Sequence, residues 1–255
     1  MGYCLIPFLV NSMYLYKGCF AGIELYLNFH FNETAQYYGH YLEKAEDPNQ
    51  SIEIPEDEIE KKCRIWNIPD PAFEEYVLSC SYICDALMLK NRIVFHGASF
   101  LWRQKAYIFT APSGTGKTTQ IKHWLAKYGN EIEVLNGDKP ILEFKDNGSV
   151  FVHPSPWKGK EGIGRDDIIA PLGGIILLKK AHHNTIERMS PDTAAKNLFC
   201  RFYSTFSSEK EILIAAQFLE HMVETVPVWQ LANKGDTEST ILTHEILETE
   251  VENEI

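Results

Sequence analysis

The sequence predicts an α/β protein with a mixed β-sheet and a small α+β region at its amino terminus. From about residue 92 onward, short apolar runs alternate with segments of helical periodicity, a pattern typical of strands and helices packed in layers. Asn147-Gly148 separates two runs of alternating polarity, which predicts a β-hairpin in the same region. A hairpin among strand–helix units favours a sheet that mixes parallel and antiparallel strands.

Composition limits the classes of protein that this chain can belong to. Its 255 residues suffice for one large domain with a small appendage, and 45% of them are hydrophobic. The net charge of −11 argues against a nucleic-acid partner. The apolar runs near the amino terminus are much shorter than the roughly 18 residues of a membrane span. Six cysteines without a Cys-x-x-Cys pair indicate reduced thiols, so we expect a cytoplasmic protein that binds no membrane.

The amino-terminal region, residues 1–90, is expected to contain one clear strand and one clear helix. Strict alternation over 23–31 predicts a half-buried strand, and 32–56 is expected to form loops around a short strand, "SIEI". A helix is expected to start at Pro71 and end at Asn91. Its predicted buried stripe consists of Phe73, Tyr76, Val77, Cys80, Cys84 and Leu87, with the two cysteines as core thiols.

Residues 91–235 are expected to form the core domain, and 236–255 a last helix with an acidic tail. The helix over 115–129 should turn Ile121, Trp124 and Leu125 inward. Ser190 and Ser208 should cap two later helices. The acidic runs "EIPEDEIEK" and "HEILETEVENEI" are expected to be a solvated face and a frayed end. The strands are predicted at 92–102, 105–110, 131–138, 140–153 (the hairpin), 172–181 and 226–231, and the helices at 115–129, 190–202, 208–224 and 239–247.

The strongest functional signal is the segment 111–118, Ala-Pro-Ser-Gly-Thr-Gly-Lys-Thr. It matches the phosphate-binding P-loop pattern G-x-x-x-x-G-K-[ST] at every position except the first glycine, which is Ala111. Its glycines let backbone N–H groups turn toward anionic oxygens, and the N-terminus of the following helix favours the same charge. Lys117 is expected to contact the outer phosphates. The predicted nucleotide-binding residues are Ser113, Gly114, Thr115, Gly116, Lys117, Thr118 and Thr119.

Two further residues are candidates for chemistry at this site. The Thr118 hydroxyl is expected to bind Mg²⁺, and the ion also needs a carboxylate, which Asp138 offers at a strand end. Asn-Gly-Asp at 136–138 is alternatively only a turn. His96 stands before the strand that leads to the glycine-rich segment, where it is either a site residue or a packed core histidine.

The irregular segment 153–167, "HPSPWKGKEGIGRDD", is the last informative stretch. It is rich in proline and glycine and contains Lys158, Lys160, Glu161 and Arg165. A loop with several cations, an aromatic ring and a glutamate could hold a nucleotide or an acceptor. The alternative is an ordinary surface loop.

Four segments make the chain resemble the HPr kinase/phosphorylase family and, more distantly, the ATP-dependent phosphoenolpyruvate carboxykinases. They are "FHGASF", "APSGTGKTT", "NGDKP" and "SPWKGKEGIG", and the resemblance spans about 90–235. It implies a P-loop kinase core in a mixed sheet. His96-Gly97 and 113–118 match the family pattern. Asp138 matches the first member of an Asp-Asp pair, and Lys139 stands in place of the second. The "PWKGKE" loop resembles that of small HPr-kinase-like proteins, some found with peptide-modification systems.

This resemblance implies an ATP-dependent kinase that transfers the γ-phosphoryl group to a hydroxyl, with serine of a peptide or protein as the expected acceptor. The implied cofactors are ATP (or GTP) and Mg²⁺. Asp138, oriented by His96, is either a metal ligand or the base that takes the acceptor proton. The expected catalytic residues are His96, Lys117, Asp138, Lys160 and Glu161, and the expected metal ligands are Thr118 and Asp138.

Two other functions fit parts of the pattern. A nucleotide-binding regulator or peptide-recognition protein without phosphoryl transfer is favoured by Lys139 in place of the second acid. A small carboxykinase is disfavoured because the chain is much shorter than those enzymes. The oligomeric state stays open, a homo-oligomer included.

Overall fold

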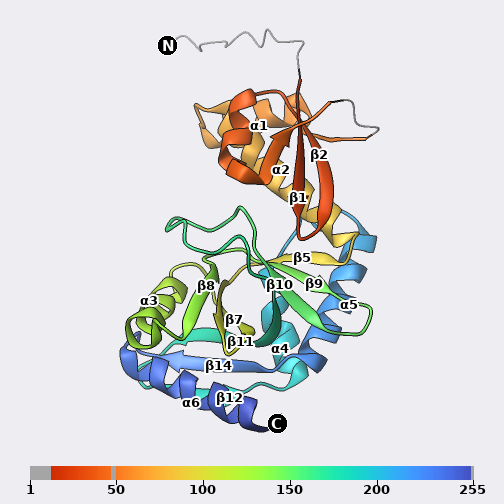
Figure 1. Ribbon diagram of the computed structural model, residues 1–255. Helices are drawn as coiled ribbons and strands as arrows, with labels where there is room; N and C mark the ends of the chain where they lie inside the picture. Colours follow the sequence, from red (N-terminus) through yellow and green to blue (C-terminus); the bar gives the residue numbers. More distant parts are fainter. Residues whose placement is uncertain (1–12, 47–49, 254–255) are drawn as a thin grey trace. The chain divides into compact units, whose positions relative to one another are not determined.

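The computed structural model describes residues 13–46 and 50–253 (Figure 1). Cys4 of the predicted thiols lies outside these residues. The chain divides into two compact units, Met1–Ala86 and Leu87–Ile255. None of the helices in the described ranges is long and apolar enough to cross a membrane.

The first unit contains a four-stranded sheet in the order β3-β1-β2-β4. Strands β1 (Tyr14–Phe20) and β2 (Ile23–Phe29) form an antiparallel hairpin, and β4 (Ile52–Glu53) pairs parallel with β2. The short β3 (Leu42–Lys44) follows a 3₁₀ segment, η1 (Asn32–Tyr41). Two helices, α1 (Glu56–Trp66) and α2 (Pro71–Met88), complete the unit.

The strand β2 and the start of α2 at Pro71 confirm the sequence analysis, but the predicted buried stripe of α2 is partly wrong. Phe73 and Val77 are 40% and 37% exposed. The buried positions near them include Glu75 and Ser79, which hydrophobic periodicity cannot detect. Glu75 accepts hydrogen bonds from the Thr34 hydroxyl (2.6 Å) and from two backbone N–H groups, and Ser79 bonds the Tyr38 hydroxyl (2.7 Å). Satisfied hydrogen bonds allow these polar groups to be buried.

In the first unit, one further prediction is confirmed and two need correction. The acidic run "EIPEDEIEK" is not only a solvated face, because most of it lies in α1, whose Ile59 is fully buried. The segment 32–56 contains η1 and β3 in addition to the expected strand β4. Cys80 and Cys84 are buried free thiols, as predicted.

The second unit is built on a mixed sheet with the strand order β13-β5-β9-β10-β11-β7-β6-β8; β14 also pairs with β11, and β12 pairs with β14. The long β11 (Ala170–Lys180) pairs parallel with β7 (Lys105–Thr110) and β14 (Val228–Asn233). The remaining strands are β5 (Arg92–Phe95), β6 (Ala98–Trp102), β8 (Ile132–Asn136), β9 (Ile141–Phe144), β10 (Val150–His153), β12 (Thr185–Arg188) and β13 (Phe202–Tyr203). The mixed α/β architecture therefore agrees with the predicted fold class.

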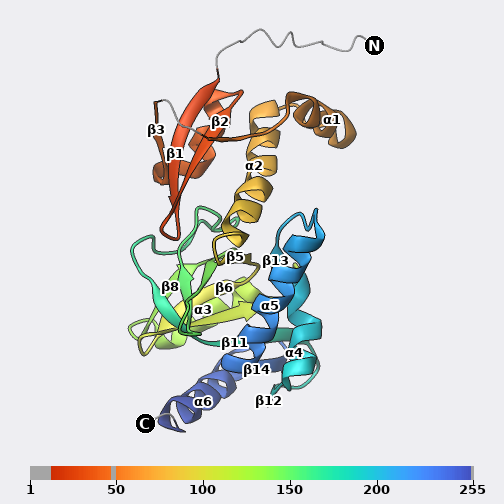
Figure 2. The ribbon, with the colours of Figure 1, turned by 90° about the vertical axis from the view of Figure 1, so that its right-hand side faces the viewer.

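Helices cover both faces of this sheet (Figures 1 and 2). Ile108 and Ile175 pack in one core with α4 (Pro191–Leu198) and α5 (Glu209–Thr225). Their neighbours in sequence, Phe109 and Ile176, pack in the other core with α3 (Lys117–Tyr128) and α6 (Thr237–Asn253). This alternation is the period of two expected for strands buried on both faces.

The helix starts and the hairpin of the second unit confirm the sequence analysis. Ser190 caps α4, Ser208 forms a capping box with Glu211, and β9 pairs antiparallel with β10. The predicted strand 92–102 is two strands, because the chain breaks at His96-Gly97. The helix expected over 190–202 ends at Leu198, and a 3₁₀ turn, η2 (Phe199–Arg201), leads into β13. The acidic tail is helical in α6 through Asn253 and is not a frayed end.

Leu125 of α3 is 39% exposed, which corrects its predicted inward position, whereas the adjacent Trp124 is fully buried. We expect Trp124→Ala to lower the free energy of unfolding by about 3–5 kcal/mol, because it leaves a cavity among packed aromatic rings. Leu125→Ala on the same helix should cost less than about 1 kcal/mol. Denaturant unfolding of both variants measures the difference, and equal losses would contradict the burial of these two side chains.

Candidate functional site

The site lies at one edge of the large sheet, where the pairing of β6 brings three segments together. Strand β6 runs antiparallel between β7 and β8, so its start meets the ends of both neighbours. In this register Ala98 faces Phe109, and Ser99 faces Asn136. The residues just before β6 and just after β7 and β8 therefore converge. They are His96-Gly97, the glycine-rich segment 111–116 and Gly137-Asp138.

The glycine-rich segment connects β7 to α3 and forms the N-terminal end of that helix. Gly116 is the N-cap residue and has a φ of 117°, a conformation that a residue with a side chain rarely adopts. Lys117, the first helical residue, turns its amine back toward the segment, where Nζ lies 3.3 Å from the Ala111 carbonyl oxygen. The start of a twelve-residue helix thus opens toward the cavity, an arrangement that favours anions.

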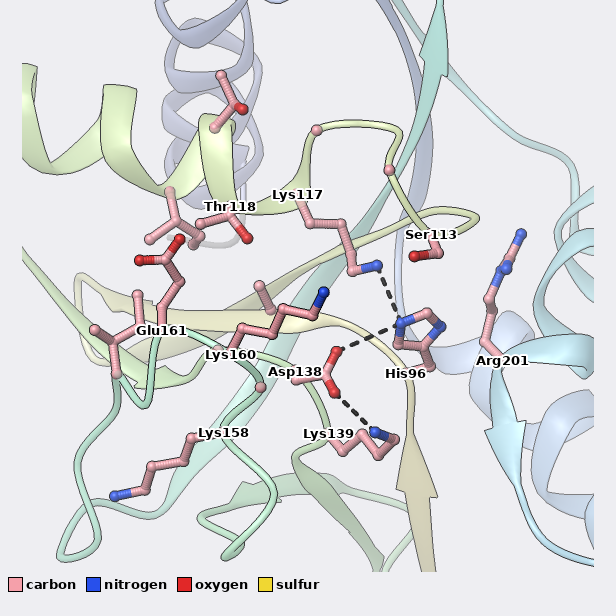
Figure 3. Close-up of a pocket in the computed structure, with 18 of the residues that line it drawn as sticks. His96, Ser113, Lys117, Thr118, Asp138, Lys139, Lys158, Lys160, Glu161 and Arg201 are labelled. Carbon is pink, nitrogen blue, oxygen red and sulfur yellow. Dashed lines mark hydrogen bonds and ion pairs between the residues drawn. The ribbon is translucent and has the colours of Figure 1, made fainter. Parts of the chain in front are cut away.

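His96 lies between a cation and an anion (Figure 3). Its Nε2 is 3.1 Å from Lys117 Nζ and 3.5 Å from Asp138 Oδ1. With the proton on Nδ1, Nε2 accepts a hydrogen bond from Lys117; with the proton on Nε2, it faces the carboxylate as a donor. The backbone holds the residue in place, since the His96 N–H donates to the Arg201 carbonyl (2.7 Å).

Asp138 is held by cations and by the backbone. Its Oδ2 accepts a hydrogen bond from Lys139 Nζ at 2.8 Å. Burial disfavours the charged form of Asp138, but hydrogen bonds from His96 and Lys139 outweigh it and lower the pKa of this carboxyl to about 2. Burial also lowers the pKa of Lys117, and Asp138 opposes this shift. Asp138 is therefore a carboxylate at neutral pH and a weak base.

A buried asparagine that the sequence analysis did not single out orients this turn. The Asn136 side-chain oxygen accepts hydrogen bonds from the backbone N–H groups of Asp138 (2.9 Å) and Lys139 (2.8 Å). Its amide donates to the Ser155 hydroxyl at 3.0 Å. Asn136 thus ties the end of β8 to the start of the loop 154–165. The "NGD" turn signal was visible in the sequence, but the link to Ser155 was not.

The loop 154–165 packs against Asp138. Lys139 N–H donates to the Trp157 carbonyl (3.1 Å), and Gly159, with a φ of 72°, packs so closely that an added Cβ would lie 2.9 Å from the Asp138 Cβ. The sequence analysis left open whether this loop belongs to the site or is an ordinary surface loop. Its close packing on Asp138 places it at the site.

The structure separates the charged residues of this loop. Lys160 lines the cavity, and within the described residues no hydrogen bond or ion pair involves its amine. Lys158 pairs with Asp166 at 2.6 Å, and its amine points away from the other labelled cations in Figure 3. Glu161 pairs with Lys122 of α3 at 3.2 Å. Arg165, which pairs with Glu133 and Asp167, does not line the cavity.

Arg201 is a candidate site residue that the sequence analysis missed. It lies in η2 and lines the same cavity as Ser113 and Lys117. Its Nε is buried and has no hydrogen-bond partner among the described residues. The guanidinium group of Arg201 adds a positive charge to this wall. No local signal could reveal this, because Arg201 is far from the glycine-rich segment in sequence.

These residues surround a cavity of about 750 Å³. Five cationic side chains and two carboxylates line it, although the whole chain carries a net charge of −11. All predicted site residues lie on its wall except Thr115. The complete lining is His96, Ala98, Ser113, Gly114, Gly116, Lys117, Thr118, Thr119, Ile121, Gly137, Asp138, Lys139, Lys158, Gly159, Lys160, Glu161, Ile163, Cys200, Arg201, Phe202 and Tyr203.

The donor set suits a cation that arrives with phosphate groups. The described residues contain no cluster of three or more His, Cys, Asp or Glu side chains that could hold a metal ion. Asp138 and Thr118 both line the cavity, and one carboxylate with one hydroxyl is what Mg²⁺ commonly takes from a protein when phosphates and water supply the rest.

The chain is similar to proteins of solved structure. No protein-family model and no curated protein matches the sequence. The HPr(Ser) kinase/phosphatase from Coxiella burnetii is similar over 64% of this chain and 99% of that chain, with a TM-score of 0.37 and 9% identity. The similarity is distant, so the chemistry of this site has to follow from its own residues.

The contact between Gly159 and Asp138 can be tested against a matched glycine of the same loop. Gly162 has a φ of 62°, but an added Cβ there would meet no atom within 4 Å. Gly162→Ala should cost about 1 kcal/mol of stability for its backbone conformation alone. Gly159→Ala should cost about 1–3 kcal/mol more, because the new methyl group overlaps Asp138. Urea unfolding checks this, and equal costs would mean that the loop does not pack on Asp138.

Proposed function

We propose that this protein is an ATP-dependent kinase that transfers the γ-phosphoryl group of ATP to a hydroxyl, with serine of a peptide or protein as the acceptor. One observation carries the proposal: a glycine-rich segment at a helix N-terminus opens into a cavity lined by five cationic side chains in an otherwise acidic chain. This combination supports a polyanionic ligand of the size of a nucleoside triphosphate.

Each part of the cavity has a task in this reaction. The backbone of 113–116, the start of α3 and Lys117 would bind the β- and γ-phosphates. Thr118 and one oxygen of Asp138 would hold Mg²⁺, which neutralises phosphate charge when bound. Arg201 and Lys160, which also line the cavity, would stabilise charge on the transferring group.

The transfer forms a bond between the acceptor oxygen and the γ-phosphorus and breaks the bond from that phosphorus to the bridging oxygen, so ADP leaves. The hydroxyl proton must pass to a base. The low pKa of Asp138 favours a role as ligand and charge partner over that of a strong base. His96, which contacts both Asp138 and Lys117, can accept a proton when its Nε2 is unprotonated.

A nucleotide-binding regulator without phosphoryl transfer is the second candidate. The contact of 2.8 Å between Lys139 and Asp138 supports it, because a carboxylate engaged by lysine is less available for catalysis. Phosphate transfer to any hydroxyl acceptor distinguishes the two functions.

Lys117→Ala should abolish phosphoryl transfer and leave the fold intact, because its amine faces the cavity and not a hydrophobic core. The assay would follow ADP release and phosphoserine formation with a panel of serine peptides and small alcohols. Lys127→Ala, an exposed lysine near the other end of α3, is the matched control and should retain activity. Normal turnover by a folded Lys117→Ala variant would rule out the proposed phosphate site.

Lys160→Ala should lower turnover by about 10²-fold, as loss of one charge contact to a transition state often does, with little change in ATP affinity. Arg165→Ala is the control from the same loop, because its guanidinium group pairs with Glu133 and Asp167 and does not line the cavity. Calorimetry of ATP binding beside the transfer assay separates the two effects. If Lys160→Ala weakened ATP binding tenfold but turned over normally at saturation, Lys160 would hold the nucleotide and not the transferring group.

A further inference from the structure

The backbone N–H and the side-chain amine of Lys139 both make hydrogen bonds in the wall of the cavity. Its backbone N–H donates to Asn136 Oδ1 (2.8 Å) and to the Trp157 carbonyl (3.1 Å). Its amine donates to Asp138 Oδ2 (2.8 Å) and lies 5.3 Å from the centre of the Tyr203 ring, within the range of a cation–π contact. An ammonium group with these contacts is a fixed part of the site.

Both carboxylates of the cavity wall are therefore paired with a lysine already. Glu161 pairs with Lys122, and Asp138 with Lys139. A divalent cation that entered alone would compete with these amines for the same oxygens. It would also be repelled by Lys117, Lys160 and Arg201 on the same wall. A polyphosphate, in contrast, would be attracted by each of these cations.

We propose that Lys139 is a positioning residue that acts as a resident cation: it occupies Oδ2 of Asp138, so the cavity excludes a free divalent ion and accepts one only together with a polyphosphate, through Oδ1. The identity of the polyphosphate as ATP rests on the proposed function, but the exclusion of a free ion does not. Lys139 thus sets the order in which the ligands enter, with the polyphosphate needed before the metal ion can bind.

The test measures Mn²⁺ binding to the full chain without nucleotide, by electron paramagnetic resonance of the free ion. The wild type should bind Mn²⁺ weakly. Lys139→Gln should bind it at least about tenfold more tightly, because one charge beside Asp138 is gone and Oδ2 is released. Lys139→Arg keeps the charge and should bind as weakly as the wild type. Lys127→Gln removes a lysine far along α3 and should also change nothing.

A second measurement follows ATP by calorimetry in EDTA and in Mg²⁺. The wild type should retain metal-free ATP binding within about tenfold of its Mg²⁺–ATP affinity, because resident cations already meet the phosphates. Lys139→Gln should lose at least about tenfold more affinity in EDTA than in Mg²⁺. If Lys139→Gln fails to fold, Lys139→Met, which keeps the apolar stem, replaces it in both measurements.

Unchanged or weaker Mn²⁺ binding by a folded Lys139→Gln or Lys139→Met variant would overturn the proposal, as would tight Mn²⁺ binding by the wild type. Failure of the proposed function has a different signature: the wild type would bind no ATP in either buffer. The Mn²⁺ result would still decide the role of Lys139 in that case, because it needs no nucleotide.

Discussion

The antiparallel pairing of β6 with both β7 and β8 is the constraint on which the site depends. Because β7 and β8 point the same way on either side of β6, their last residues and the residues before β6 must meet at one edge. A shift of register by one residue would turn the alternating side chains to the opposite face and separate these segments. The packed cores on both faces oppose such a shift, since Ile108 and Phe109 belong to different cores.

Electrostatics then gives this edge its chemical character. Burial disfavours the charge of Lys117, and the buried Nε of Arg201 has no acceptor in the described part of the chain. A bound anion would offset the desolvation of Lys117, and binding of a polyphosphate would stabilise the folded protein by an amount that rises with the logarithm of its concentration relative to Kd. The two carboxylates satisfy these cations only in part: Asp138 favours the charge of Lys117 but is paired with Lys139, and Glu161 is paired with Lys122. The cavity is thus complementary to an anion with several charges.

In the loop 154–165, the packing of the backbone determines which charged side chains reach the cavity. Asn136 and Gly159 hold the loop against Asp138, and the loop in turn presents Lys160 to the cavity. Its other charged residues are engaged in ion pairs: Lys158 with Asp166, Glu161 with Lys122 of α3, and Arg165 with Glu133 and Asp167. Of the three cations of this loop, Lys158 and Lys160 thus line the cavity, and Lys158 is already paired, whereas Arg165 lies outside it.

The sequence by itself determined the features that depend on neighbouring residues: the α/β class, the helix caps at Ser190 and Ser208, the hairpin at Asn147-Gly148 and the glycine-rich segment before α3. It also placed Lys117 as a candidate through the glycine-rich pattern, and His96 and Asp138 because each stands at the end of an apolar run. Only the tertiary structure brought Arg201 and Tyr203 to the same cavity, paired Lys139 with Asp138 and removed Arg165 from it. It also decided which face of α2 is buried, where Glu75 replaces the apolar residues that periodicity favours. The reason is the same in each case. Periodicity and caps report contacts within a few residues, whereas a buried charge is permitted by partners that lie far away along the chain.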